Sequence, residues 1–192
     1  ERSAVGITEQ LVENGFTADR MKTGTPPRVD GRSINYSVLE EQLGDPDPRR
    51  FSYTDTPILQ DQRSCHIAHT NVQVHDILRD GFDRSPMFNG RIQGLGPRYC
   101  PSIEDKVVRF ADRDSHHVFL EPETLDGELV YCNGISTSLP PDIQIEIVRA
   151  MPGCEHAEIM QYGYAVEYDM VRPHQIDATC MVKSVAGLFL AG

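Results

Sequence analysis

A cysteine in the middle of the chain lies among residues that can make it reactive. Cys100 follows Arg98 by two positions and directly precedes the pair Pro101-Ser102, which is typical of the start of a helix. The exposed amides of a helix start and a nearby guanidinium both favour an anion, so they lower a thiol's pKa from its usual value of about 8.5. The pattern predicts Cys100 as a catalytic residue, either a thiolate nucleophile or a general acid. A buried structural cysteine in a tight turn is the alternative, because cysteine is among the most buried residue types.

A helix beginning after Ser102 must position this cysteine. Ser102 is a good N-cap residue, and Asp105 follows three positions later, as in a weaker form of the capping box. Apolar residues then recur at helical spacing and predict an inward face formed by Ile103, Val107 and Phe110. Glu104, Asp105, Lys106 and Arg109 fall off that stripe, so we expect them to lie outside the core.

The segment Gly96–Phe110 resembles the nicotinamide-dinucleotide segment of the glucose-inhibited division protein A family. Further stretches are similar to the same family, and together they cover essentially the whole chain: Lys22–Arg28, Arg84–Met87, Asn133–Pro140, Gly163–Tyr168 and Gly187–Gly192. Members of this family are flavin-dependent enzymes that install a carboxymethylaminomethyl group on the wobble uridine of certain tRNAs.

The resemblance implies a set of cofactors and partners. NADH reduces FAD, methylene-tetrahydrofolate supplies one carbon, and glycine or ammonium supplies the amine. The implied partners are tRNA, a GTPase of the same modification pathway and a second copy of the chain in a homodimer. A thiolate adding to C6 of uracil would activate C5, and Cys100 has the chemistry for that role or for that of a general acid.

The resemblance also implies which residues bind cofactors. Ser3 matches a flavin-contacting serine. Lys22 is either a contact to RNA or cofactor phosphate or part of an inter-domain hinge. The residues expected to bind the nicotinamide cofactor are Gly96, Pro97, Arg98, Tyr99, Cys100, Pro101, Ser102, Ile103, Glu104, Asp105, Lys106, Val107, Val108, Arg109 and Phe110.

Composition narrows the class of protein. The chain has 192 residues, 39% hydrophobic and 24% charged, with a net charge of −11; this is an ordinary globular composition, and it argues against a surface that binds nucleic acid everywhere. A local basic patch remains open. No apolar run approaches the roughly 20 residues that span a bilayer. The 5 cysteines include no C-x-x-C pair, which disfavours a disulfide framework and a zinc site and fits a reducing, cytoplasmic compartment.

We expect an α/β fold: the central fragment of a flavin-dependent fold with two dinucleotide-binding domains. Residues 1–25 and 131–192 are expected in the FAD-binding domain, and residues 26–130 in an inserted α+β NAD(H)-binding domain. Helices are expected over 7–16, 71–82, 102–110 and 141–151, with Asn71 capping the second and Pro152-Gly153 stopping the last. Strands are expected over 20–22, 34–38, 51–53, 65–69, 117–120, 129–132 and 162–168, with 117–120 paired with 129–132 and 188–191 a buried parallel strand.

Several alternatives remain at this point. The chain contains no G-x-G-x-x-G, so we expect a piece from the middle of a longer enzyme. The nearest alternative function is the related folate- and FAD-dependent tRNA uracil-5-methyltransferase, and another is a non-catalytic module that binds tRNA or a partner protein. A Cys–His hydrolase is disfavoured because no nucleophile elbow is present. His66 and His69 are three apart on a predicted strand and face opposite sides, so no metal site is expected.

Overall fold

The computed structural model describes residues 5–57, 62–94, 96 and 101–191. Within these residues no helix combines the length and the apolar character needed to cross a membrane. The structure has a mixed α/β architecture with two antiparallel sheets and four α-helices among the described residues.

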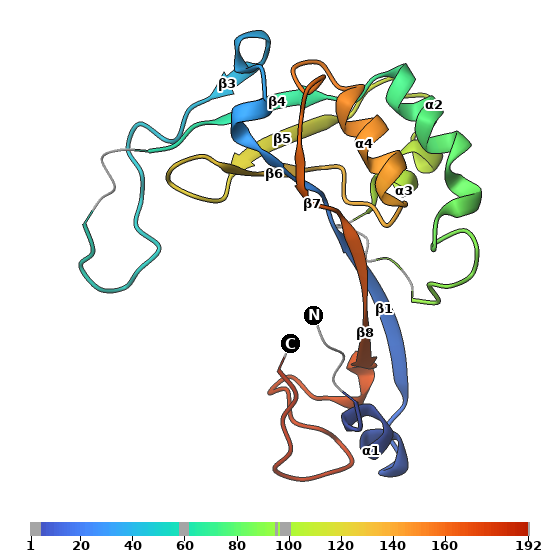
Figure 1. Ribbon diagram of the computed structural model, residues 1–192. Helices are drawn as coiled ribbons and strands as arrows, with labels where there is room; N and C mark the ends of the chain where they lie inside the picture. The colour runs from blue at the N-terminus through green and yellow to red at the C-terminus, as the bar shows by residue number, and fades with distance from the viewer. Residues whose placement is uncertain (1–4, 58–61, 95, 97–100, 192) are drawn as a thin grey trace.

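The larger sheet lies beside the helices in the upper body of Figure 1 and has six strands in the order β3-β4-β5-β6-β2-β7. Every neighbouring pair is antiparallel. The predicted pairing of residues 117–120 with 129–132 is confirmed, and Leu120 lies opposite Cys132. The strands are β2 (Arg28–Asp30), β3 (Glu40–Gln42), β4 (Cys65–His69), β5 (His117–Pro122), β6 (Leu129–Asn133) and β7 (Ile159–Gln161).

Three helices gather on one side of this sheet (Figure 1), and the core contains side chains from both the helices and the sheet. They are α2 (Val72–Asp80), α3 (Ile103–Arg109) and α4 (Pro141–Arg149). Alternate residues of the central strands, Val118 and Leu120 on β5 and Val130 and Cys132 on β6, are fully buried. This alternation arises because successive side chains of a strand point to opposite faces.

The start of α2 matches the prediction. The side-chain oxygen of Asn71 accepts a hydrogen bond from the Val74 amide at 2.9 Å, which satisfies one free donor of the first turn. The Asn71 side-chain amide donates to the Ala150 carbonyl at 2.8 Å. One asparagine therefore caps α2 and ties it to the end of α4.

A two-stranded ribbon projects from this body (Figure 1) and carries α1 (Ile7–Glu13) and residues 172–191 at its far end. It consists of β1 (Ala18–Thr25) and β8 (Tyr164–Val171), paired over eight positions. Only residues 20–22 were predicted as the first strand. The strand is longer because β8 pairs with it through Gly24 and Thr25.

The chain passes from the ribbon to the larger sheet at Pro26-Pro27, between β1 and β2. The expected boundary at 130/131 falls inside β6, and the next two elements, α4 and β7, pack with the larger sheet. Which segments belong to which cofactor-binding domain stays a prediction.

Two predicted strands in the polar region are wrong. Residues 34–38 contain a short 3-10 turn instead, because the Asn35 side chain caps it by accepting from the Ser37 amide at 3.3 Å. Residues 51–53 form no strand, and Phe51 and Tyr53 are fully exposed. The 3-10 turns are η1 (Gly31–Ser33), η2 (Tyr36–Val38), η3 (Phe82–Arg84) and η4 (Pro173–Gln175).

The prediction of a buried parallel strand over 188–191 is also wrong. Phe189 forms an isolated antiparallel bridge with Met181, and its side chain is 57% exposed. A short apolar run does not identify which segment will pair with it or whether it will be buried.

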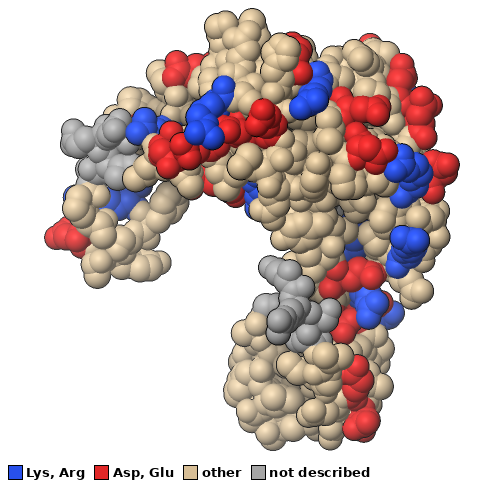
Figure 2. Space-filling view, in the orientation of Figure 1, with Lys and Arg blue, Asp and Glu red and all other residues tan. Residues whose placement is uncertain are grey.

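The molecule has a curved outline in the space-filling view (Figure 2). On the face shown, acidic and basic side chains intermingle over the upper body, whereas the lobe around α1 and the carboxyl-terminal residues is largely uncharged.

Candidate functional site

Helix α3 begins with the predicted capping box. The Ser102 hydroxyl oxygen accepts from the Asp105 amide at 3.2 Å, and the Asp105 carboxylate accepts from the Ser102 amide at 3.4 Å. Gly96 lies beside this first turn, since a Cβ on it would be 3.8 Å from the Asp105 carboxylate. The start of α3 is therefore fixed by its own side chains, as the sequence predicts.

An ion pair between a buried lysine and a half-buried aspartate joins this turn to the ribbon. Lys22 of β1 is only 3% exposed, and its Nζ lies 3.6 Å from Asp105 Oδ2 and 2.9 Å from the sulfur of Met87. Lys22 therefore joins β1 to the first turn of α3.

Glu104 lies in the core, whereas the helical pattern placed it outside. Its side chain is 0% exposed, and Oε1 accepts from the Thr137 hydroxyl at 2.8 Å and the Ser138 amide at 3.3 Å. Oε2 has no hydrogen-bond partner. Burial raises the pKa of Glu104, against the opposing effect of hydrogen bonds from backbone amides and the Thr137 hydroxyl. The reason for the error is tertiary: residues 136–138 cover the first turn of α3, where the Ile103 amide donates to the Ser136 carbonyl at 2.8 Å.

The loop leading to this site is held by the ribbon. Glu167 of β8 accepts hydrogen bonds from the amides of Gln93 and Gly94 at 2.9 and 2.8 Å. Gly94 lies so close to β1 that a Cβ would be 2.8 Å from the Met21 carbonyl carbon. The loop that approaches α3 is thus fastened to the ribbon by a carboxylate.

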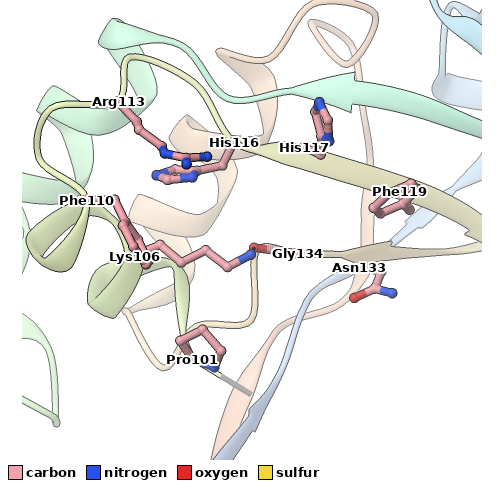
Figure 3. A pocket seen from close by; sticks show the side chains of 9 residues that line it. All are labelled: Pro101, Lys106, Phe110, Arg113, His116, His117, Phe119, Asn133 and Gly134. Carbon is pink, nitrogen blue, oxygen red and sulfur yellow. Dashed lines mark hydrogen bonds between the residues drawn. The ribbon is translucent and has the colours of Figure 1, made fainter. Parts of the chain in front are cut away.

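A pocket of about 360 Å³ opens along the Lys106–Phe110 side of α3 (Figure 3). Lys106 reaches across it and donates to the Gly134 carbonyl at 2.9 Å. The guanidinium of Arg113 lies 5.7 Å from the centre of the Phe110 ring. His116, His117 and Phe119 complete the aromatic part of the wall. The pocket thus combines cations with ring faces.

Two histidines lie behind and within this wall. The ring of His75 on α2 is buried, and its Nε2 is 2.8 Å from the Thr70 hydroxyl. His116 lies next to it, at 5.3 Å between ring centroids, and His116 Nε2 is buried with no hydrogen-bond partner. Burial lowers the pKa of both imidazoles, and for His116 the neighbouring His75, Lys106 and Arg113 lower it further. Both rings are therefore neutral at neutral pH.

Comparison with known proteins identifies the family. The model of the family described as glucose inhibited division protein A matches residues 1–192. The chain belongs to this family.

Relatives in the glucose inhibited division protein A family match this chain over its whole length. A protein of Cytophaga hutchinsonii named "tRNA uridine 5-carboxymethylaminomethyl modification enzyme MnmG" is 57% identical over 193 residues, which is 100% of this chain and 31% of the relative. A protein of Christiangramia forsetii with the same name is 58% identical over 193 residues, again 100% of this chain and 31% of the relative. The uracil-5-methyltransferase alternative receives no support from these relatives.

Solved structures of the family agree with the fold. GidA of Aquifex aeolicus in crystal form I superposes with a TM-score of 0.85 at 42% identity, over 96% of this chain and 32% of that chain. Crystal form II gives 0.85 at 40% identity, over 97% and 30%. The chain spans about a third of the length of these proteins.

The predicted site residues of this family member fall into three groups. Ser3, Pro97, Arg98, Tyr99 and Cys100 lie outside the described residues. Ser102, Ile103, Glu104 and Val107 are buried, as predicted for Ile103 and Val107. Gly96, Val108, Arg109 and Phe110 are exposed, and Pro101, Asp105 and Lys106 are half-buried. Phe110 was expected inside, but at 46% exposed it borders the pocket.

Sequence reasoning missed the rest of the pocket. Arg113, His116, His117 and Phe119 follow α3 and line the same cavity as Lys106. The adjacent histidines His116-His117 could have drawn attention to this segment. The sequence does not show that they lie next to Lys106 in space. Of the described residues, no group of three His, Cys, Asp or Glu side chains is arranged to hold a metal ion.

Proposed function

We propose that this chain is part of an enzyme that adds a carboxymethylaminomethyl group to C5 of the wobble uridine of tRNA. One observation carries the proposal: relatives named for this modification are 57% and 58% identical to the chain from end to end. Identity spread over the whole chain includes both the ribbon and the body, so it is more than a shared motif.

The reaction needs oxidation–reduction chemistry and a one-carbon unit. FAD, reduced by NADH, would supply the first, and methylene-tetrahydrofolate would supply the second. Ser3 is proposed as a flavin contact and Gly96–Phe110 as the nicotinamide-cofactor segment. Lys106, within that segment, lines a pocket of about 360 Å³ and brings a positive charge to it, which suits a nucleotide phosphate.

Cys100 is proposed to activate the uracil ring. Its thiolate would bond to C6, and the electron pair of the C5–C6 double bond would move toward the C4 oxygen as an enolate. C5 of that enolate can attack an electrophilic carbon. Loss of the C5 proton then restores the double bond and releases the thiolate. The alternative role, a general acid, needs no bond between sulfur and carbon.

The proposal includes partners and a compartment. tRNA is the substrate, a GTPase of the same modification pathway is the proposed partner, and the protein acts as a homodimer in the cytoplasm. Residues 1–25 and 131–192 are proposed to contribute to the FAD-binding domain and residues 26–130 to the NAD(H)-binding domain.

Two cysteine variants test the function in cells whose only copy of the full-length protein carries the change. Cys100→Ser should abolish wobble-uridine modification while the thermal midpoint and tRNA binding stay unchanged. Cys132→Ser is the control: its thiol is buried on β6, where burial raises its pKa, so a hydroxyl there should lower the midpoint. Nucleoside analysis of the tRNA beside melting curves measures both. Normal modification with Cys100→Ser would remove Cys100 from the chemistry. Wobble-uridine modification that persists in cells without the protein would contradict the function itself.

A further inference from the structure

The ribbon carries two oppositely charged residues directly across from one another. Lys22 of β1 is paired with Glu167 of β8, and Arg20 is paired with Asp169 at the next position on the same face. Directly opposed residues of an antiparallel pair project their side chains from one face. Arg20 Nη1 lies 3.6 Å from Glu167 Oε2, and Arg20 Nε lies 3.1 Å from Asp169 Oδ1. One face of the ribbon therefore presents a short row of four charged side chains.

Glu167 holds the chain on the amino-terminal side of Cys100. Its Oε1 accepts from the amides of Gln93 and Gly94 at 2.9 and 2.8 Å, and hydrogen bonds from amides to a carboxylate are among the stronger ones in proteins. Gly94 also packs against the backbone of β1, because a Cβ on it would be 3.0 Å from the Lys22 amide nitrogen. The chain is thus fixed to the ribbon at Gly94.

Lys22 holds the chain on the carboxyl-terminal side of Cys100. Its Nζ lies 3.6 Å from Asp105 Oδ2, and the Asp105 carboxylate accepts from the Ser102 amide at 3.4 Å. The sulfur of Met87 lies 2.9 Å from Lys22 Nζ and 3.2 Å from the Ser102 hydroxyl. Ser102 is therefore fixed to the ribbon through the ammonium of Lys22 and the groups around it.

Both ends of the segment that carries Cys100 thus meet the same cross-strand pair. The segment leaves the ribbon at Gly94 and returns to it at Ser102, and Gly96 already lies beside the Asp105 carboxylate. Tying down both ends of a short stretch of chain removes most of the conformations that it could otherwise adopt. Such restraint matters for a reacting group, because a displacement of about 1 Å can lower a rate by about a hundredfold.

We propose that Lys22 and Glu167 are positioning residues for the Cys100 thiol. They act through the two ends of its segment, and neither needs to touch the substrate. This role rests on the proposed function, because it assumes that Cys100 acts on uracil. It goes beyond that function by assigning the geometry of the thiol to a pair of residues on the ribbon.

Three variants of the full-length holoprotein separate positioning from charge. Glu167→Ala removes the acceptor of both loop amides, whereas Glu167→Gln removes only the charge and keeps an oxygen that can accept from them. Asp169→Ala is the matched control. It removes the same charge from the same face of the ribbon and also breaks a contact with Arg20, but it leaves the loop amides paired with Glu167.

The first readout is the pH profile of Cys100 alkylation by iodoacetamide, mapped by mass spectrometry. The thiolate is the reactive form, and an ordinary thiol titrates at about 8.5. Glu167→Ala should raise the midpoint of this profile toward that value, because the thiol is no longer kept next to the start of α3. Loss of a negative charge alone would lower the midpoint, since it favours the thiolate. Glu167→Gln and Asp169→Ala should therefore show no upward shift.

The second readout is the kinetics of tRNA modification. Glu167→Ala should lower kcat by about tenfold or more and leave KM for tRNA within about twofold, because positioning acts on the chemical step and not on binding. Glu167→Gln should retain most of the wild-type kcat. Lys22→Met should resemble Glu167→Ala, whereas a lysine that contacts RNA would raise KM instead.

Gly94→Ala keeps the test valid if Glu167→Ala is unstable. Its added Cβ would lie 2.8 Å from the Met21 carbonyl carbon, so it should push the loop off the ribbon without changing any ribbon side chain. It should give the same upward shift of the alkylation midpoint and the same loss of kcat.

Two results would overturn the proposal: Glu167→Ala and Gly94→Ala that match Asp169→Ala in both readouts, or a wild-type Cys100 that already titrates at about 8.5. Failure of the proposed function looks different. Normal modification with Cys100→Ser would remove this thiol from the chemistry, and the alkylation profile would still show whether Lys22 and Glu167 hold it in place.

Discussion

Glu104 shows at the scale of a residue how a helical pattern can be overruled. It lies one position past the first core residue of α3 and would face solvent on an isolated helix, yet residues 136–138 cover it and leave Oε2 without a partner. A buried carboxyl of this kind favours its protonated form. Its ionisation therefore opposes folding, and the effect has a definite sign with pH.

We expect Glu104→Gln to change the pH dependence of stability. The pKa of Glu104 is raised in the folded state above its ordinary value of 4.5, so the stabilising contribution of the neutral carboxyl is complete below that pH and is lost as the pH rises through the folded pKa. Glutamine cannot ionise, so this loss, at most about 1.4 kcal/mol per pH unit, should disappear. Denaturant unfolding of both proteins between pH 4 and 8 measures it.

Glu146→Gln, at an exposed position of α4, is the control and should keep the wild-type slope. Identical slopes for Glu104→Gln and wild type would show that the carboxyl does not ionise unfavourably in the fold.

The Lys22–Asp105 pair gives a second prediction at this scale. Asp105→Ala should lower the free energy of unfolding by about 3 kcal/mol, because it removes half of the capping box and leaves the nearly buried Lys22 ammonium without this partner. Asp76→Ala removes an exposed ion pair with Arg79 on α2 and should cost no more than about 0.5 kcal/mol. Equal costs in chemical denaturation would mean that the buried pair contributes no more than a surface pair.

At the scale of an element, α3 depends on its neighbours. It has seven residues, too few for a stable isolated helix in water. The missing stability comes from its capping box, from the burial of Ile103 and Val107 and from the hydrogen bond to Ser136. The ribbon adds a further tie by holding the preceding loop through Glu167.

Glu167→Ala should release that loop. The amides of Gln93 and Gly94 lose their shared carboxylate acceptor, and each charged hydrogen bond is worth about 1.5–3 kcal/mol, so their hydrogen exchange should speed up by tenfold or more. Asp169→Ala is the matched control, since Asp169 lies two positions further along β8 and, like Glu167, contacts Arg20, but its other partner is Thr8 and not the loop amides. If both variants leave the two exchange rates unchanged, the ribbon does not restrain the loop.

At the scale of the whole molecule, one buried glutamine joins the ribbon to the body. Gln144 of α4 is 1% exposed; its amide group donates to the carbonyls of Leu139 and Gly163 at 2.7 and 2.9 Å, and its oxygen accepts from the Gly163 amide at 2.7 Å. Gly163 directly precedes β8 and lies so close to Thr25 that a Cβ would be 2.7 Å from its carbonyl oxygen. Both ribbon strands therefore meet at this point.

Gln144→Met should loosen this junction. The replacement is similar in size but leaves the amide and carbonyl of Gly163 unpaired in the interior, so we expect a loss of about 2–4 kcal/mol and a broader small-angle scattering distribution for the projecting ribbon. Glu146→Met, two positions along the same helix on its exposed side, should change neither quantity. If Gln144→Met has the wild-type stability and scattering distribution, backbone pairing alone orients the ribbon.

The sequence by itself determined the features that depend on neighbours along the chain. The capping box of Ser102 and Asp105, the Asn71 cap, the hairpin of β5 and β6 and the helix ending before Pro152-Gly153 follow from local hydrogen bonds, turn chemistry and side-chain spacing. The long resemblance within Gly96–Phe110 also pointed to the family that the comparisons show.

Only the tertiary structure decided which groups meet across the chain. It buried Glu104 under residues 136–138, paired Lys22 with Asp105, left Phe110 at a pocket and placed Phe189 in an exposed antiparallel bridge. The physical reason is that burial and the pKa of a carboxyl depend on every segment packed against it. A periodic pattern records which side of one element is apolar, and it contains no information about the loop or strand that will cover the other side.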